Sequence, residues 1–246
     1  MIKRSSVTSM RASHLPVIVT ALSLAGVGPY SFALRAEDSR DRLTPIVRTS
    51  IIADSSKYNR LLKNKLFVTP DEIARYVYLT NGKDGDRSAA LYQAVEKKGA
   101  MPGNFWITAT EASAAIPYPG GGEPALDIKS VTIQRYDAPL PASTAEAVHE
   151  LWLAMLERSQ PEAEIQVAPT AIFSATNPSG TKLRAMASWL EHNSISLALM
   201  VLGQDLINYT QMSAERRVKL AHEIEKESKR LLERAKKVPL RKSPKG

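Results

Sequence analysis

The sequence predicts an α+β fold in which an antiparallel sheet, built from two hairpins plus single strands, carries three helices on one face. Two pairs of apolar segments, one of which contains the aromatic and β-branched run at 104–110, are each joined by a turn that contains Gly and Pro, the pattern of a β-hairpin. Three later segments repeat apolar residues at helical spacing. The chain has 246 residues, of which 43% are hydrophobic, so it is long and apolar enough to bury a sizeable core.

The N-terminal segment has the layout of a secretory signal peptide. Residues 1–14 carry basic side chains and no acid, residues 15–28 form an uncharged apolar run, and small residues precede Leu34 and Glu37. As a helix this run would span about 21 Å against a hydrocarbon core of roughly 30 Å, which favours cleavage over permanent anchoring. We therefore predict a signal peptide at 1–36 and a periplasmic or extracellular protein. The alternatives are an uncleaved membrane anchor and a mitochondrial transit peptide.

The rest of the chain is predicted to begin with an irregular lead-in and to continue as a single α+β domain. Residues 37–65 are charged and irregular, whereas residues 66–236 contain the regular elements. The β-branched and aromatic residues at 73–79 predict the first strand. A single helical turn that begins at Thr69 is the competing interpretation.

Two hairpins are predicted after this strand. The first joins strands at 89–96 and 104–111 through a turn with two Gly and one Pro. The second joins strands at 171–176 and 181–187 through Asn177-Pro178-Ser179-Gly180.

A stretch rich in Gly and Pro separates the two hairpins. Residues 116–124 contain three Pro and three consecutive Gly, so they continue neither a helix nor a central strand. We expect a mobile loop or a boundary between two halves. Glu123-Pro124 break the pattern of a phosphate-binding loop. The β-branched residues at 131–136 then predict a single strand.

Three helices complete the predicted fold. Residues 142–158 carry one apolar stripe, and residues 194–211 are apolar on nearly every side, which predicts a helix at the centre of the core. Residues 213–236 form the last helix, and residues 237–246 a basic, disordered tail. The predicted buried stripe of the last helix consists of Val218, Ala221, Ile224, Ser228, Leu231 and Ala235.

The chain has a formal net charge of +8, and the excess of basic residues that produces it lies at the two ends of the chain. Residues 1–36 carry +4 and residues 213–246 carry +7, whereas residues 37–129 carry +1 and residues 130–212 carry −4. A nucleic-acid-binding domain would show a basic face within its folded body, so we expect no nucleic-acid partner. We expect the basic tail to be a solvated end of the chain, and contact with an anionic surface or another envelope component is the alternative.

The sequence lacks the patterns of familiar catalytic and metal sites. It has no cysteine, which excludes disulfides, thiolate zinc sites and a cysteine nucleophile. His149-Glu150 begin like the zinc motif HExxH, but Leu153 stands where the second histidine is needed. A triad of Ser174, His149 and Asp205 would be a chance combination, since a chain of this length offers many such triples. We predict no catalytic residue, no cofactor and no metal.

One candidate ligand site lies in and beside the loop after the second hairpin. Trp189 is close in sequence to Arg184, Glu191 and His192, so an exposed ring with charged neighbours would line a groove. Core packing is the expected role of this tryptophan, and the groove is the alternative. The sequence therefore favours an exported protein with a non-catalytic binding or assembly role. The alternatives are an exported hydrolase whose active site follows no known motif and a membrane-peripheral envelope protein.

Overall fold

The structure is a computed structural model of the whole chain, and it describes residues 41–46, 57–67, 72–80, 85–93, 104–116, 130–160, 170–187 and 194–238. All of these residues belong to one unit of the chain, Ala33–Gly246. The predicted signal peptide, most of the Gly/Pro-rich stretch and the tail from residue 239 onwards lie outside the described residues.

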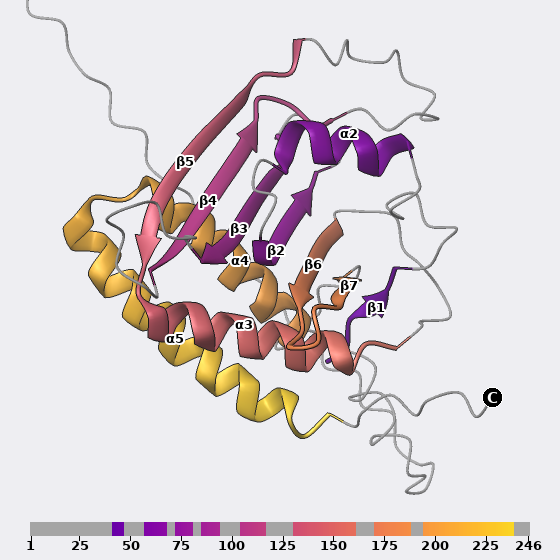
Figure 1. Cartoon of the computed structure of the whole chain (residues 1–246), viewed down its shortest axis with the longest axis vertical. Coiled ribbons are helices and arrows are strands. Elements are labelled where there is room, and N and C mark those ends of the chain that lie inside the picture. Colours follow the sequence, from indigo (N-terminus) through magenta and orange to yellow (C-terminus); the bar gives the residue numbers. More distant parts are fainter. Residues whose placement is uncertain are drawn as a thin grey trace, which may run out of the picture. The chain divides into compact units, whose positions relative to one another are not determined.

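The described strands form one antiparallel sheet of seven strands in the order β1-β7-β6-β2-β3-β4-β5 (Figure 1). The central strand β2 lies between its sequence neighbour β3 and the distant strand β6. The bounds are β1 (Thr44–Pro45), β2 (Glu72–Leu79), β3 (Arg87–Gln93), β4 (Phe105–Ala112), β5 (Ile133–Leu140), β6 (Thr170–Thr176) and β7 (Lys182–Ala187).

Both predicted hairpins are confirmed. β3 pairs with β4, and β6 pairs with β7, each in antiparallel register. The residues predicted at 73–79 form β2 rather than a helical turn. The strand predicted at 131–136 is β5, which continues through Pro139 to Leu140. A proline is tolerated there because β5 lies at the edge of the sheet, where a missing N–H costs no ladder bond.

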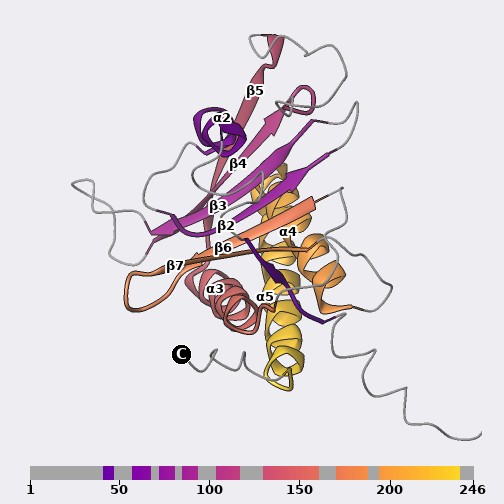
Figure 2. The same ribbon diagram turned by 90° about the vertical axis from the view of Figure 1, so that its right-hand side faces the viewer.

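Three helices pack on one face of the sheet, as predicted (Figure 2). They are α3 (Ala142–Glu157), α4 (Ile195–Gln211) and α5 (Ala214–Ala235). α3 and α4 contact the strands, and α5 packs on both of these helices. The core beneath them contains a chain of aromatic rings, in which Phe173 lies between Tyr76 and Trp152 at centroid distances of 5.4 and 5.6 Å.

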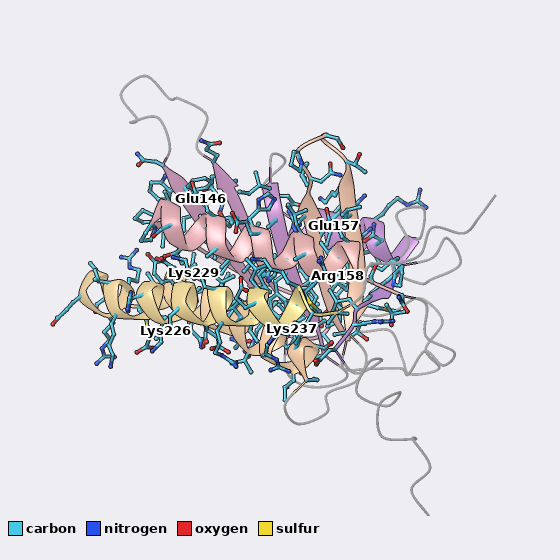
Figure 3. All side chains as sticks on the ribbon, turned by 90° about the horizontal axis from the view of Figure 1, so that it is seen from below. Glu146, Glu157, Arg158, Lys226, Lys229 and Lys237 are labelled. Atoms are coloured by element: carbon cyan, nitrogen blue, oxygen red, sulfur yellow. The ribbon has the colours of Figure 1, made fainter. Side chains whose placement is uncertain are left out.

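α3 and α5 lie side by side and run in the same direction (Figure 3). Near their starts, Thr144 Oγ1 donates to the carbonyl of Ala221 at 3.4 Å, and near their ends Arg158 Nε donates to that of Val238 at 3.0 Å. The first turns of α5 extend past the start of α3. Val218 lies in this overhang and is 73% exposed, so its predicted place in the buried stripe is wrong. The other five stripe residues are buried.

α4 is largely buried between the sheet and α5, as its apolar composition predicts. Val201 on its outer side is 55% exposed. The helix covers β3, β4 and β5 and has α5 on its other side. Within the described ranges, no helix combines the length and the apolar character that a membrane crossing requires.

A fourth helix, α2 (Lys57–Leu66), lies on the opposite face of the sheet (Figure 2). It corrects the expectation that 37–65 is irregular and that helices cover one face only. Tyr58, Leu62 and Leu66 follow at intervals of four residues, so they form one stripe that is buried against the sheet. The remaining residues of α2 are mostly Lys, Arg and Asn, which conceals this narrow stripe in the sequence.

Candidate functional site

An open groove of about 530 Å³ lies where the end of β5 meets α3, α4 and α5. Buried Leu140 and Ala221 line it together with exposed Pro139, Pro141 and Val218, so its surface is mostly apolar. Small-molecule sites in proteins have volumes of roughly 300–1,000 Å³ and a similar apolar lining with a few polar groups. This feature, hereafter the β5–α5 groove, is therefore a candidate binding site.

The chain forms the rim of the groove where strand β5 passes into helix α3. Two prolines, Pro139 and Pro141, flank Leu140 and make the turn rigid, because each fixes its own φ angle. The hydroxyl of Tyr209 on α4 donates to the carbonyl of Pro139 at 2.7 Å. Burial raises the pKa of Tyr209, against the opposing effect of the nearby Arg217 charge, so this donor keeps its proton at neutral pH.

Arg217 on α5 supplies a hydrogen-bond donor that has no partner within the described part of the chain. Its side chain is half-buried and lines the groove, and its Nε is buried without a hydrogen bond to any described residue. A buried polar group without a partner costs about 1–3 kcal/mol, so an acceptor at this point would be stabilised. A negatively charged acceptor would form the most favourable hydrogen bond with Arg217, since the guanidinium is a permanent cation.

The carboxylate that lines the groove is already paired. Glu225 accepts a hydrogen bond from Ser143 Oγ at 2.7 Å and one from Lys229 Nζ at 2.5 Å. The bond from Lys229, and then that from Ser143, hold the pKa of Glu225 below its usual range, so the group is ionised at neutral pH. The acid is therefore neutralised by Lys229, whereas Arg217 and His222 also line the groove.

The start of α3 adds to the positive character of the groove. Its N-cap is Pro141, which makes no side-chain cap, and its first turn contains no acidic residue. The first backbone N–H groups of a helix have no partner within the helix, and they carry a partial positive charge. Pro141 and Thr144 of this turn line the groove, so these dipoles reinforce Arg217 and favour an acidic ligand.

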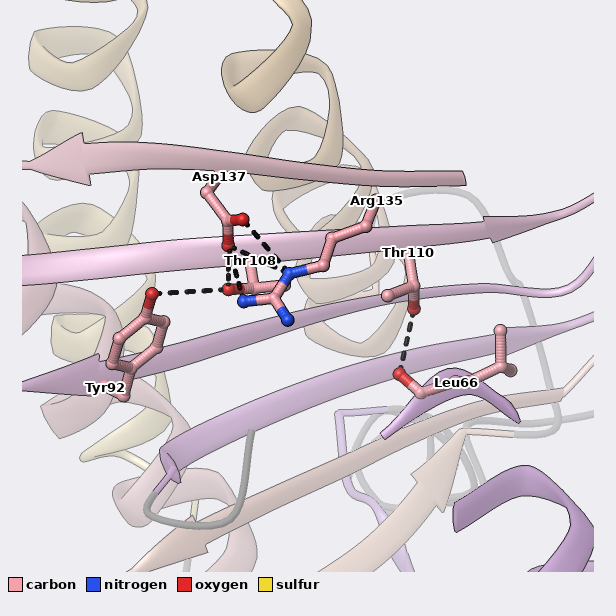
Figure 4. Close-up of polar contacts among 6 residues, drawn as sticks. All are labelled: Leu66, Tyr92, Thr108, Thr110, Arg135 and Asp137. Carbon is pink, nitrogen blue, oxygen red and sulfur yellow. Dashed lines mark hydrogen bonds and ion pairs between the residues drawn. The ribbon is translucent and has the colours of Figure 1, made fainter. Parts of the chain in front are cut away.

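Polar side chains also gather on the sheet face that α2 partly covers, but they satisfy one another (Figure 4). Thr108 Oγ1 lies 2.5 Å from Asp137 Oδ1 and 3.4 Å from Tyr92 Oη. Arg135 binds the same carboxylate through Nε at 3.0 Å and through Nη2 at 3.1 Å. Thr110 Oγ1 donates to the carbonyl of Leu66 at 2.9 Å, which attaches the end of α2 to the sheet.

Two arginines on this face of the sheet, Arg75 and Arg184, contact α2 or the residue that follows it. Arg75 is 3% exposed, lies 3.9 Å from the ring centroid of Phe67 and forms an ion pair with Glu72. Burial, and then the charge of Arg184, lower the pKa of Arg75 to about 9. Arg184 itself donates from Nη2 to Asn59 Oδ1 at 3.2 Å. These contacts connect β7 to α2, and β2 to Phe67, the residue that follows α2.

The structure places one of the four residues predicted to line a ligand groove. Arg184 lies on β7, next to α2, whereas Trp189, Glu191 and His192 lie outside the described residues. The sequence reading missed the β5–α5 groove. The one local sequence feature that could indicate this groove is the pair of prolines around Leu140. Arg217 comes to the groove only through tertiary packing, so its position in the sequence gives no such indication.

The combination of Ser174, His149 and Asp205, which the sequence offers as a catalytic triad, is not assembled in the structure. Phe173 and Ala175 point into the core beneath the helices, so Ser174 between them points to the other face of the sheet. His149 lies on α3 with Nε2 2.9 Å from the carbonyl of Thr176.

In the described ranges, no three His, Asp or Glu side chains are placed to hold a metal ion. Comparisons with protein-family models, curated proteins and solved structures found no match.

Proposed function

We propose that this protein is an exported, non-catalytic binding protein whose β5–α5 groove takes a small molecule with an apolar body and one acidic group. The observation that carries the proposal is the buried Nε of Arg217, a donor without a partner among the described residues, beside an apolar surface. The acidic group would accept a charge-assisted hydrogen bond from Arg217. Leu140 and Ala221 would cover the apolar part.

A pair of fluorescent probes tests this proposal, since 8-anilinonaphthalene-1-sulfonate carries an acidic group that neutral N-phenyl-1-naphthylamine lacks. We expect the wild type to bind the sulfonate probe more tightly. Arg217→Met should weaken binding of the sulfonate about tenfold or more, because a hydrogen bond to a charged group contributes roughly 1.5–3 kcal/mol. Binding of the neutral probe should change little. Titrations followed by fluorescence give both dissociation constants.

Two further variants make the probe experiment specific to the groove. Arg216→Met removes the same charge from an exposed neighbouring position of α5 that does not line the groove, and it should leave both affinities unchanged. Ala214→Trp places a large ring at the mouth of the groove and should weaken both probes. Equal sulfonate binding by wild type and Arg217→Met would contradict the proposal.

The export part of the proposal rests on residues 1–36, with their basic start, uncharged run and small residues. In a bacterial host, we expect the tagged chain in the periplasmic extract or the medium, with an N-terminus at Leu34 or Glu37. Leu22→Arg interrupts the apolar run and should leave the full-length chain in the cell, whereas Thr8→Arg should not. Fractionation followed by N-terminal sequencing measures this, and full-length wild type in the cytosol would contradict export.

A further inference from the structure

β5 is the long open edge of the sheet. Among the described strands it pairs with β4 alone, and it has eight residues, whereas β1 at the other edge has two. A long edge strand offers unpaired backbone groups to another strand unless something blocks it.

The direction of the outer backbone groups of β5 follows from two hydrogen bonds. The carbonyl of Pro139 accepts from Tyr209 and so points away from β4, whereas the carbonyl of Thr132 accepts from a backbone N–H just after β4. Because the direction alternates along an antiparallel strand, Arg135 and Asp137 also direct their N–H and C=O groups outwards. Proline has no N–H and Tyr209 occupies its carbonyl, so further strand pairing must stop at Pro139.

We infer that two copies of this chain pair through β5 in an antiparallel, two-fold arrangement centred on Tyr136. This register places Arg135 of each copy opposite Asp137 of the other, and each such pair exchanges both of its N–H···O bonds. A two-fold axis at Arg135 would set two arginines against each other, and an axis at Asp137 two aspartates. Like charges directly opposite are destabilising, so only the register at Tyr136 is complementary.

The single chain already presents the groups that this interface needs. Arg135 and Asp137 lie on one face of β5, 3.0 Å apart, and their side chains are 42% and 39% exposed. In the dimer, two arginines and two aspartates would alternate across the axis. Tyr136 points to the other face, where it would meet its counterpart in an aromatic cross-strand pair. The block at Pro139 and the two-fold symmetry both limit the assembly to a closed dimer.

Charge-reversed variants of the full chain test the pairing. We expect a dimer for the wild type in sedimentation equilibrium. R135D gives an edge with two acids and D137R an edge with two bases, so each should weaken dimerisation by about tenfold or more. An equimolar mixture of the two variants should form a heterodimer, because acids then oppose bases. The double variant R135D/D137R reverses both charges and should dimerise as the wild type does.

The control variant is R230D, which changes an exposed arginine in the second half of α5, beyond the turns that meet the end of β5, and should dimerise normally. Recovery of dimers in the mixture and in the double variant shows that the single variants are folded, and circular dichroism confirms it. A wild type that stays monomeric over the whole concentration range overturns the inference. So do single variants that each dimerise as tightly as the wild type.

Discussion

Replacing Asp86 with alanine is expected to lower the free energy of unfolding by about 3 kcal/mol, because it leaves two buried backbone donors without an acceptor. Asp86 is fully buried beside the start of β3. Its Oδ1 accepts from the backbone N–H of Thr80 at 2.8 Å, and its Oδ2 accepts from that of Ile116 at 2.7 Å. One carboxylate thus joins the end of β2 to the chain that follows β4.

The same residue gives the stability a pH dependence with a defined sign. Burial raises the pKa of Asp86 above its ordinary value of 3.8, and the hydrogen bonds from Thr80 and Ile116 oppose this only in part. Between these two pKa values, the folded state binds more protons than the unfolded state. The stability that Asp86 contributes is therefore complete below pH 3.8 and decreases as the pH rises through the folded pKa.

Urea unfolding at several pH values measures both effects. Asp86→Asn does not titrate, so the advantage of wild type over this variant should widen as the pH falls from neutral towards 3.8. Glu223→Ala removes an exposed acid from α5 and should change the free energy of unfolding by less than about 0.5 kcal/mol. A constant difference between wild type and Asp86→Asn at all pH values would contradict the assigned pKa shift.

The hairpins and the helix layer are predictable because their signals are local. The β-branched residues of β6, the turn residues and the alternating apolar residues of β7 lie within 18 consecutive positions, 170–187. The apolar stripe of α3 likewise recurs within 16 residues. α2 is missed because it owes its stability to the sheet, where Tyr58, Leu62 and Leu66 are buried, rather than to a broad apolar face of its own.

The groove and the open edge depend on contacts that sequence spacing does not encode. Arg217 lies in the groove beside Tyr209 only because α5 extends past the start of α3. The same overhang exposes Val218, which helical periodicity alone assigns to the core. The complementary pair Arg135 and Asp137 is visible in the sequence, but its position on an edge strand follows from the order of the strands.

Replacing Gly203 with alanine should destabilise the protein, although alanine favours a helix by roughly 1 kcal/mol over glycine. An added Cβ would lie 2.6 Å from two ring carbons of Tyr76 and 2.7 Å from a third. Tyr76 is 1% exposed and packs on Phe173 at 5.4 Å, so the ring has no room to move. Overpacking of this kind costs about 1–3 kcal/mol or more, and we expect a net loss of about 2 kcal/mol.

A double-mutant cycle separates this contact from the helix propensity. In a Tyr76→Leu background the ring is absent, so Gly203→Ala should become neutral or stabilising, and the interaction energy should exceed about 1 kcal/mol. Val201→Ala, at an exposed position of the same helix, should stay within about 0.5 kcal/mol of the wild type. Urea unfolding of the four chains of the cycle gives the coupling. An equal loss in both backgrounds would mean that the Tyr76 ring is not what requires glycine at this position.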